Sequence, residues 1–420
     1  MRIAVVGAGI SGITCAYLLC GKYKEVYVYE KEPRPGGGIY SIKFSEEGKE
    51  FFIDLGFAIY NRKYYSNLVR LLDRLDIHSQ ECKKEICIYH HSSKIGWTVG
   101  EKNNFFPKIA SWLKPLNYRV MESWLKIKRN AEDFLQKRDF DKPLLEYLSE
   151  IGVSKDVVGL FIRPLIQGLW TGIDSTEIEH YPAHYFCGLL QHIGLFEKGE
   201  QTRWRTVRGG SFRIVSQMVS ALIHPVKYQS EVIRVVRHPD YVEVYTKNGE
   251  KEIFDAVIIA ISAKDALSIL EKPSDSEELI LGSFSYGEGY VILHVDERFA
   301  SSSLFPHASY IIQVSEDKKV LPIVTWDLVR MFELPLKRRL FITFTTNPNL
   351  IPRDKVICAY KRKFIKPTWK MLAVQRRFGE INGVNRTYFC GDYWGWGTLE
   401  DSLSSALKVV QYFFKEQVSL

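Results

Sequence analysis

Three glycines near the start of the chain have a spacing that suits phosphate binding. Gly7, Gly9 and Gly12 form a Gly-x-Gly-x-x-Gly pattern directly after the β-branched run Arg2–Val6. In this order the first glycine permits a tight turn, the second lets the backbone approach a pyrophosphate, and the third allows close helix-to-strand packing. Glu30 follows eighteen residues after Gly12, where a carboxylate can accept the hydroxyls of an adenosine ribose. The spacing predicts a dinucleotide site, and Glu30 disfavours a 2′-phosphate there.

The elements that must position these residues are a strand, a tight turn and a helix. Helix-compatible residues continue from Ile13 to Leu19, so we expect the backbone of Ile10 and Ser11 to face the phosphates at a positive helix end. A second strand, Glu25–Tyr29, then leads into Glu30. For the glycine triplet taken alone, the alternative is an ordinary glycine-rich turn between a strand and a helix.

Two further glycine-marked turns favour FAD over NAD, which has no flavin half to hold. Directly after Glu30 comes a turn whose backbone can approach a ligand closely and whose arginine offers a charge. Its expected contacts are Lys31, Arg34, Gly36, Gly37 and Gly38. At the other end of the chain, the strand Thr387–Cys390 runs into Gly391 and Asp392, and a helix is expected over about 398–413. We expect Asp392 to accept ribityl hydroxyls, and the helix start at Thr398 and Leu399 to serve the flavin edge. A plain aspartate near a helix N-cap is the alternative for Asp392.

These segments resemble the flavin-containing amine oxidase superfamily, which includes monoamine oxidases, protoporphyrinogen oxidases and phytoene desaturases, over nearly the whole chain. Within it, the chain is similar to a bacterial and archaeal group of predicted NAD/FAD-binding oxidoreductases. The strings that carry this likeness are Ile53–Asn61, Trp204–Ser211, Leu293–Asp296 and Cys390–Asp401. The resemblance implies a backbone contact from Val232 to the adenine. It also implies a noncovalent FAD, since no cysteine stands where monoamine oxidases attach their flavin.

Departures from the family pattern bear on the substrate. No lysine occurs in Tyr290–Val295, where amine oxidases typically place a flavin-facing lysine, and Thr398 replaces an aromatic cage residue. Both absences count against an amine. Gly38 stands where the family has the arginine of a Gly-Gly-Arg turn, while Leu399 and Ser402 replace a His and a Gly of the closer group. These departures motivate one alternative, a catalytically silent FAD-binding partner protein.

The expected fold class is α/β, with a Rossmann-like FAD-binding domain and an interleaved α+β substrate domain with a mixed sheet. The FAD-binding domain, a parallel sheet with a β-meander, is expected from 1–80, 204–264 and 384–420, and the substrate domain from 81–203 and 265–383. The meander is predicted from the strands Val232–Val236, Tyr241–Tyr245 and Phe254–Ala260, after which the chain is expected to return to the Rossmann sheet.

The expected function is that of an FAD-dependent oxidoreductase that dehydrogenates an apolar organic substrate, such as a lipid or isoprenoid, by hydride transfer to flavin N5. The catalytic residues stay unknown, and the candidates to line the flavin are Tyr393, Trp394, Trp396, Thr398 and His294. Packing between lobes is the alternative for the aromatic residues, and a satisfied core histidine for His294. A second functional alternative is a non-redox flavin mutase resembling UDP-galactopyranose mutase, for which Arg203, Arg205 and Arg208 would supply cationic groups.

The charge and the cysteine content limit which binding partners are expected. The net charge of +8 is spread along 420 residues, which gives no reason to expect nucleic acid, and the seven scattered cysteines lack a zinc spacing, so no metal is expected. A cytoplasmic protein with a small apolar substrate is expected, and its oligomeric state is left open. A basic, apolar segment, Trp112–Arg129, suggests peripheral membrane contact, although Pro115 interrupts it and a lobe helix with a solvated basic face is the alternative.

Overall fold

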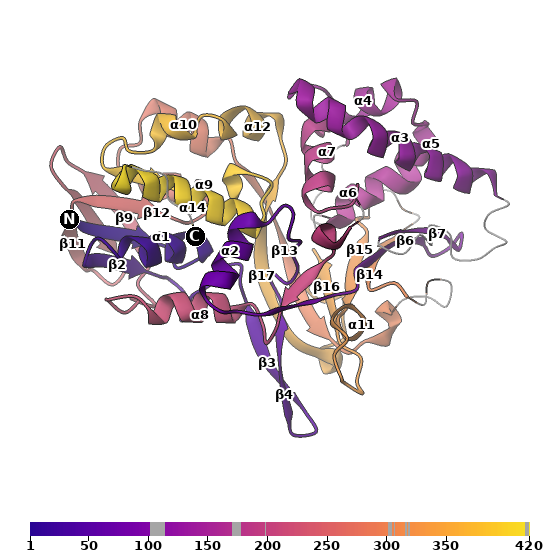
Figure 1. Cartoon of the computed structure of the whole chain (residues 1–420), viewed down its shortest axis with the longest axis horizontal. Helices are drawn as coiled ribbons and strands as arrows, with labels where there is room; N and C mark the ends of the chain where they lie inside the picture. Colours follow the sequence, from indigo (N-terminus) through magenta and orange to yellow (C-terminus); the bar gives the residue numbers. More distant parts are fainter. Residues whose placement is uncertain are drawn as a thin grey trace. The chain divides into compact units, whose positions relative to one another are not determined.

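The computed structural model describes residues 1–100, 114–169, 178–197, 199–300, 305, 307–315, 317, 320–415 and 420. The chain divides into two compact units, each assembled from separate segments (Figure 1). The first unit contains residues 1–80, 206–285 and 370–420, and the second contains residues 81–205 and 286–369. Residues 265–285 and 370–383 therefore cluster with the first unit. The assignment of FAD and substrate to these units stays a prediction.

A four-stranded parallel sheet forms the centre of the first unit, with the strand order β18-β12-β1-β2. Its strands are β1(Arg2–Val6), β2(Glu25–Tyr29), β12(Ala256–Ile259) and β18(Thr387–Phe389). Most positions of these strands are apolar and buried, as a parallel sheet covered on both faces requires. The helices α1(Ile10–Leu19) and α14(Leu399–Phe414) pack against each other beside it (Figure 1).

The meander of the first unit is a separate three-stranded sheet, β11-β10-β9. Its strands are β9(Val232–Arg237), β10(Val242–Thr246) and β11(Lys251–Phe254). The strand predicted over Phe254–Ala260 is observed as β12, which leaves the meander at Asp255 and pairs with β1 in the parallel sheet, so the predicted return to that sheet is confirmed. The third strand of the meander is instead β11, which sequence reasoning did not separate from it. The change of sheet has a local cause: the carboxylate of Asp255 accepts a hydrogen bond from the backbone N–H of Arg2 at 2.6 Å.

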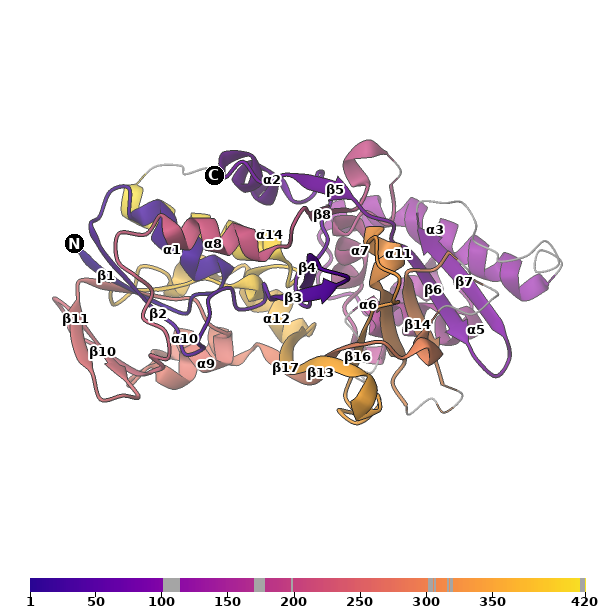
Figure 2. The same cartoon turned by 90° about the horizontal axis from the view of Figure 1, so that it is seen from below.

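Further elements complete the first unit, and α8 lies beside α1 (Figure 2). They are the hairpin β3(Ser41–Glu46) and β4(Lys49–Asp54), and the helices α2(Ser66–Arg74), α8(Phe212–Ser220), α9(Ala263–Ile269), α10(Asp275–Gly282), α12(Trp369–Gln375), α13(Phe378–Ile381) and the short η7(Asp392–Trp394). The short strands β5(Ser79–Glu81) and β8(Arg205–Val207) pair where the chain passes between the units.

The second unit is built on a seven-stranded mixed sheet in the order β17-β13-β16-β15-β14-β6-β7. Its strands are β6(Glu85–His90), β7(Ile95–Gly100), β13(Ser285–His294), β14(Tyr310–Val314), β15(Ile323–Asp327), β16(Phe341–Thr345) and β17(Val356–Lys366). Its helices are α3(Pro115–Lys137), α4(Leu144–Glu150), α5(Lys155–Val157), η2(Val158–Ile162), α6(Arg163–Leu169), α7(Ala183–His192) and α11(Leu328–Phe332). Four single turns are η3(Ile178–His180), η4(Glu200–Thr202), η5(Glu297–Phe299) and η6(Arg353–Lys355).

Helix α3 covers most of the segment that suggested membrane contact. Pro115 begins this helix instead of interrupting it, because the first helical position needs no N–H partner. The apolar stripe of α3 is buried, and its Trp124 packs against Phe161 and Phe196 of the same unit. Trp112 and Leu113 lie outside the described residues. Among the helices that the structure describes, none is both long and apolar enough to cross a membrane.

Candidate cofactor site

The three glycines at the start of α1 are required for different reasons. Gly7 adopts a φ of +97°, and a Cβ on Gly12 would lie 2.0 Å from the carbonyl oxygen of Gly7, so both positions need glycine for the fold itself. Gly9 has an ordinary φ of −68°, and a Cβ there would meet no atom within 4 Å. The protein itself therefore leaves space beside Gly9.

The first turn of α1 offers unpaired donors beside that space. Gly9 is the N-cap and supplies no side chain, and among the described residues the N–H groups of Ile10, Ser11 and Gly12 have no partner. The Ser11 hydroxyl is already used, since it donates to the carbonyl oxygen of Ser402 at 3.1 Å. Only the backbone of Ser11 is thus free to meet a phosphate, which a helix N-terminus favours electrostatically.

Glu30 is buried and held by the backbone at the end of β2. Its Oε2 accepts the N–H of Ala8 at 2.7 Å, and its Oε1 accepts the N–H of Glu32 at 2.9 Å. Each carboxylate oxygen has a second lone pair, so a fixed Glu30 can still accept hydroxyl groups. This arrangement suits a ribose.

The turn after Glu30 lies against the glycine loop. Gly36 N–H donates to Ala8 O at 2.8 Å, and a Cβ on Gly37 would come within 3.1 Å of Gly9 Cα. Lys31 is exposed. Gly38, which replaces the family arginine, accepts the N–H of Phe57 through its carbonyl at 3.0 Å.

Arg34 is turned toward its own loop. Its guanidinium lies 3.7 Å above the Tyr40 ring and donates to Pro35 O at 3.3 Å and Ile39 O at 3.4 Å. It also lines a hollow of about 500 Å³, together with residues of α8 such as Phe212. Whether Arg34 reaches the cofactor stays a prediction, as does the adenine contact of Val232, which is buried at the start of β9.

The start of α14 is satisfied largely by its own side chains. Thr398 and Asp401 form a capping box, in which the Asp401 carboxylate accepts from Thr398 N–H at 2.8 Å and from Thr398 Oγ1 at 2.6 Å. Burial raises the pKa of Asp401 to about 7. Among the described residues, only the N–H groups of Leu399 and Glu400 are left unpaired in this turn. They are the donors that α14 can offer a flavin edge.

The loop before α14 is fixed by two residues that sequence reasoning missed. Ser405 Oγ accepts the N–H of Gly391 at 3.0 Å, and Gln375 Nε2 donates to Tyr393 O at 2.8 Å and Gly395 O at 2.6 Å. Asp392 begins η7 and is half-buried. Its contact to a ribityl chain stays a prediction.

The aromatic candidates on this loop differ in their surroundings. Tyr393 and Trp394 are buried, and both rings pack edge-on against Phe284, at centroid distances of 4.9 Å and 5.8 Å. Trp394 also packs against Phe378 at 4.9 Å. These contacts lie within the first unit and favour a packing role. Trp396 is half-buried and stays a candidate.

His294 is a fully buried residue of β13 with both ring nitrogens engaged. Its Nδ1 accepts the N–H of Asp296 at 3.0 Å, so Nε2 carries the proton and donates to Thr343 Oγ1 at 2.7 Å. Burial lowers the pKa of His294 to about 4. The geometry favours the interpretation as a satisfied core histidine over a catalytic role.

Two of the segments that resemble the family, Ile53–Asn61 and Trp204–Ser211, meet at the buried carboxylate of Asp54, a residue that was not among the predicted site residues. Asp54 accepts hydrogen bonds from the N–H and the hydroxyl of Ser211, the N-cap of α8, each at 2.9 Å. It also accepts one from Ser41 Oγ at the start of β3. Burial raises the pKa of Asp54 to about 6. Asp54 thereby ties the β3–β4 hairpin to a helix of the same unit.

The arginines that suggested a mutase are partly neutralised. Arg203 Nη1 lies 3.3 Å from Glu81 Oε1, and Arg205 Nη1 lies 3.7 Å from the same oxygen. Because the two arginines share one carboxylate, part of the charge that they could offer a diphosphate is already compensated. No observation on Arg208 favours that alternative.

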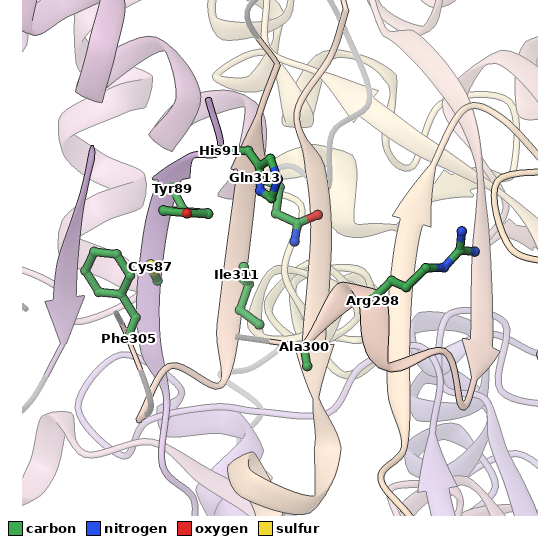
Figure 3. A pocket seen from close by; sticks show the side chains of 8 residues that line it. All are labelled: Cys87, Tyr89, His91, Arg298, Ala300, Phe305, Ile311 and Gln313. Carbon is green, nitrogen blue, oxygen red and sulfur yellow. The ribbon is translucent and has the colours of Figure 1, made fainter. Parts of the chain in front are cut away.

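The second unit contains a small cavity of about 160 Å³ on its sheet (Figure 3). It is lined by Cys87, Tyr89, His91, Arg298, Ala300, Phe305, Ile311 and Gln313. Its one cation, Arg298, points away from the other side chains and is paired with Asp296 at 2.5 Å (Figure 3). None of the predicted site residues lines this cavity.

The open space beside Gly9, the unpaired donors of α1 and the fixed Glu30 fit the pyrophosphate and ribose of FAD. In the part of the chain that the structure describes, no cluster of three or more His, Cys, Asp or Glu residues is arranged to hold a metal ion.

Comparisons with known proteins agree with this fit. Residues 10–324 match the model of the flavin containing amine oxidoreductase family. Over 290 residues the chain is 24% identical to an L-amino-acid oxidase of Trimeresurus stejnegeri, covering 65% of this chain and 53% of that protein. It is also 24% identical, over 280 residues, to the flavin-containing amine oxidase B of Bos taurus, covering 62% of this chain and 50% of that protein. The matches thus span about half the length of these relatives.

Solved structures share the fold across the whole chain. A fatty acid isomerase of P. acnes, which produces CLA, superposes with a TM-score of 0.73 at 15% identity and covers 98% of both chains. Cyclohexylamine oxidase of Brevibacterium oxydans superposes with a TM-score of 0.70 at 15% identity, covering 98% of this chain and 99% of that one. Since the family model matches three quarters of the sequence, this chain belongs to the family of flavin-containing amine oxidoreductases, and its cofactor is FAD.

Proposed function

We propose that this chain dehydrogenates an apolar organic substrate with noncovalently held FAD. The observation that carries the proposal is the start of α1, where free space at Gly9, three unpaired N–H groups and the fixed carboxylate of Glu30 suit one dinucleotide. When bound, FAD supplies a flavin ring that accepts a hydride. The chain's residues then have to bind the cofactor, orient the substrate and exclude water.

The first unit supplies the binding part of this scheme. Gly36 and Gly37 keep the second turn against the glycine loop, and Gln375 fixes the loop that precedes α14. The unpaired N–H groups of Leu399 and Glu400 would face the pyrimidine edge of the flavin. Because peptide dipoles are fixed by the fold, they stabilise negative charge there without reorganisation.

An apolar substrate is supported by the second unit and by a comparison. No lysine occurs among Tyr290–Val295, and His294 in this segment is engaged on both nitrogens, so β13 offers little to an amine. The sheet of this unit carries a row of buried aromatic rings, including Tyr310, Trp326 and Phe344. The fatty acid isomerase with the same fold is compatible with a lipid.

The test is anaerobic reduction of the bound flavin. Purified protein should show flavin absorbance and release FAD on acid precipitation. Mixed without oxygen with a fatty acid, a prenyl alcohol, a porphyrinogen and benzylamine, the flavin should bleach with one of the first three and not with benzylamine. Bleaching by benzylamine alone, or by none of the four, would overturn the proposal. The Gly9→Val variant, which fills the space for the pyrophosphate, serves as the protein control that cannot hold FAD.

A further inference from the structure

Lys84 of the second unit is a buried lysine on an aromatic surface. It immediately precedes β6, is 6% exposed, and its Nζ lies 3.8 Å from the centroid of the Trp204 ring and 5.2 Å from that of Tyr310. Its neighbour Lys83 provides a contrast within the same chain, since its side chain is 61% exposed and pairs with Glu333. Lysine is almost never buried unless it has a partner.

Within the described part of the chain, Lys84 has no anionic partner and its Nζ makes no hydrogen bond. The ionisable groups on the segments around it are Cys82, Lys83, Glu85, Arg203, Arg205, Tyr310 and Asp327. The buried Asp327 is paired with Arg330 and Arg339. Lys83 pairs with Glu333, and Arg203 and Arg205 share Glu81, so these two carboxylates are engaged by cations other than Lys84. The Tyr310 hydroxyl donates to Gly168 O at 2.6 Å.

A buried ammonium without a counterion is costly, and aromatic faces recover only part of that cost. Because burial disfavours the charged form, the pKa of the Lys84 amine is lowered to about 7. Replacing such a residue by a hydrophobic one is often neutral for stability. A lysine here is therefore better explained by an anion that binds to it than by packing.

The surface next to Lys84 identifies the rest of the ligand. Tyr310 and Trp326 are directly paired across β14 and β15, so their side chains share one face of the sheet, and their ring centroids are 5.5 Å apart. Phe344 continues the row at 5.0 Å from Trp326. All three rings are buried. A single cation at the end of an aromatic row matches a molecule with one anionic end and an apolar body.

We propose that Lys84 binds the carboxylate of an apolar acid whose hydrocarbon part lies along the aromatic row of Tyr310, Trp326 and Phe344. The inference deepens the proposed function, on which it rests, because it narrows the apolar substrate to carboxylic acids. Lys84 would act as a binding residue that determines specificity.

The test measures binding of decanoate and decan-1-ol to the FAD-loaded protein by titration calorimetry. Wild-type protein should bind decanoate, and Lys84→Met should weaken that binding at least tenfold while leaving decan-1-ol binding within a factor of three. Lys83→Met is the matched control and should bind both probes as the wild type does. Because Lys84→Met removes a buried charge, its melting temperature should not fall, which separates lost binding from lost folding.

A pH series distinguishes the charge from the shape of the side chain. Decanoate binding to the wild type should weaken at least tenfold between pH 7 and pH 9, as the amine loses its proton. Lys84→Arg stays charged over this range, so it should bind decanoate with a flat profile. Cys82 and Tyr310 are present in both proteins, so only titration of Lys84 explains the difference.

The outcomes separate this inference from the proposed function. Equal decanoate affinity of the wild type and Lys84→Met, or no decanoate binding by folded wild-type holoprotein, would overturn the role of Lys84. Flavin that stays oxidised with every apolar compound would instead overturn the proposed function, whatever the calorimetry shows. Decanoate binding that depends on Lys84 supports the inference even if decanoate itself is not oxidised.

Discussion

The two helices that begin at glycine-marked turns in the first unit are built in opposite ways. The first turn of α1 has no side-chain cap, open space at Gly9 and three unpaired N–H groups. The first turn of α14 is closed by Thr398 and the buried Asp401, with two unpaired N–H groups left. The difference teaches that a Gly-rich loop before a helix does not by itself define one kind of site. The start of α1 leaves donors and space that a ligand can use, whereas the start of α14 is completed mainly by the protein.

The largest expected effect is a loss of FAD binding at the start of α1. Gly9→Val should lower FAD affinity by at least 1,000-fold, equivalent to ~4 kcal/mol, because the side chain occupies the space of the pyrophosphate. The apoprotein should melt at the wild-type temperature, since the new Cβ meets no atom within 4 Å and φ is ordinary. FAD titration followed by flavin fluorescence and a thermal melt measure the two quantities. Gly21→Val at the other end of α1 is the control, and equal FAD affinity in Gly9→Val would contradict this account.

The next effect concerns the self-completed helix start. The pKa of Asp401 is raised by burial from 3.8 to about 7, so the protonated form stabilises the fold. That contribution is complete below about pH 4 and is lost as pH rises through about 7, a difference on the order of 4 kcal/mol. Asp401→Asn should remove this decline. Urea unfolding of both proteins between pH 4 and pH 8 measures it. Asp54 and Glu400, whose pKa values are also raised by burial, are unchanged in both proteins. Parallel stability curves for the two proteins would refute the assignment.

A smaller effect distinguishes Gly12, which the fold requires, from Gly9, which we propose that the ligand requires. The quantity compared is the stability of the apoprotein. In Gly12→Ala the new methyl group would lie 2.0 Å from Gly7 O, so α1 must move away from the loop. Overpacking of this kind should cost about 3 kcal/mol of stability, in addition to weakening FAD binding. Gly9→Ala, the same substitution at the open position, should leave apoprotein stability unchanged. Thermal melts without FAD distinguish them, and similar melting temperatures for both variants would remove the distinction.

The smallest effect tests whether α14 also supports a neighbour. Glu400 accepts the N–H groups of Asn67 at 2.8 Å and Leu68 at 3.0 Å, and so caps α2. Glu400→Ala should lower stability by about 1 kcal/mol, or a few degrees in melting temperature, because two helix donors lose their acceptor. Glu380→Ala, at an exposed pair with Arg377, should change nothing measurable. An unchanged melting temperature in Glu400→Ala would show that solvent replaces the cap without cost.

Features encoded by neighbouring residues were predictable, and those made by distant residues were not. The glycine pattern and the acidic residue of the predicted dinucleotide site all lie within the first thirty residues, at Gly7, Gly9, Gly12 and Glu30. The helix predicted over 398–413 is observed as Leu399–Phe414. Thr398 and Asp401 have the spacing of a capping box, a signal available in the sequence and left unused. The pairing of Asp54 with Ser211 joins residues 157 positions apart, which no local pattern reveals. Lys84 could not be found either, because its isolation depends on Trp204 and Tyr310 and on the absence of a nearby acid among the described residues.

The packing of α1 against α14 sets the order in which the protein can be completed as it is made. The Ser11 hydroxyl donates a hydrogen bond to the carbonyl oxygen of Ser402, 391 positions later, and the sulfur atoms of Cys15 and Cys390 are 3.9 Å apart. At roughly 5–20 residues per second, a ribosome needs roughly 20–80 s to reach those partners after making α1. Throughout that interval the side of α1 that packs on α14 lacks this cover, whereas α8, which also contacts α1, is made earlier. The core between α1 and α14 is therefore among the last parts of the first unit to form.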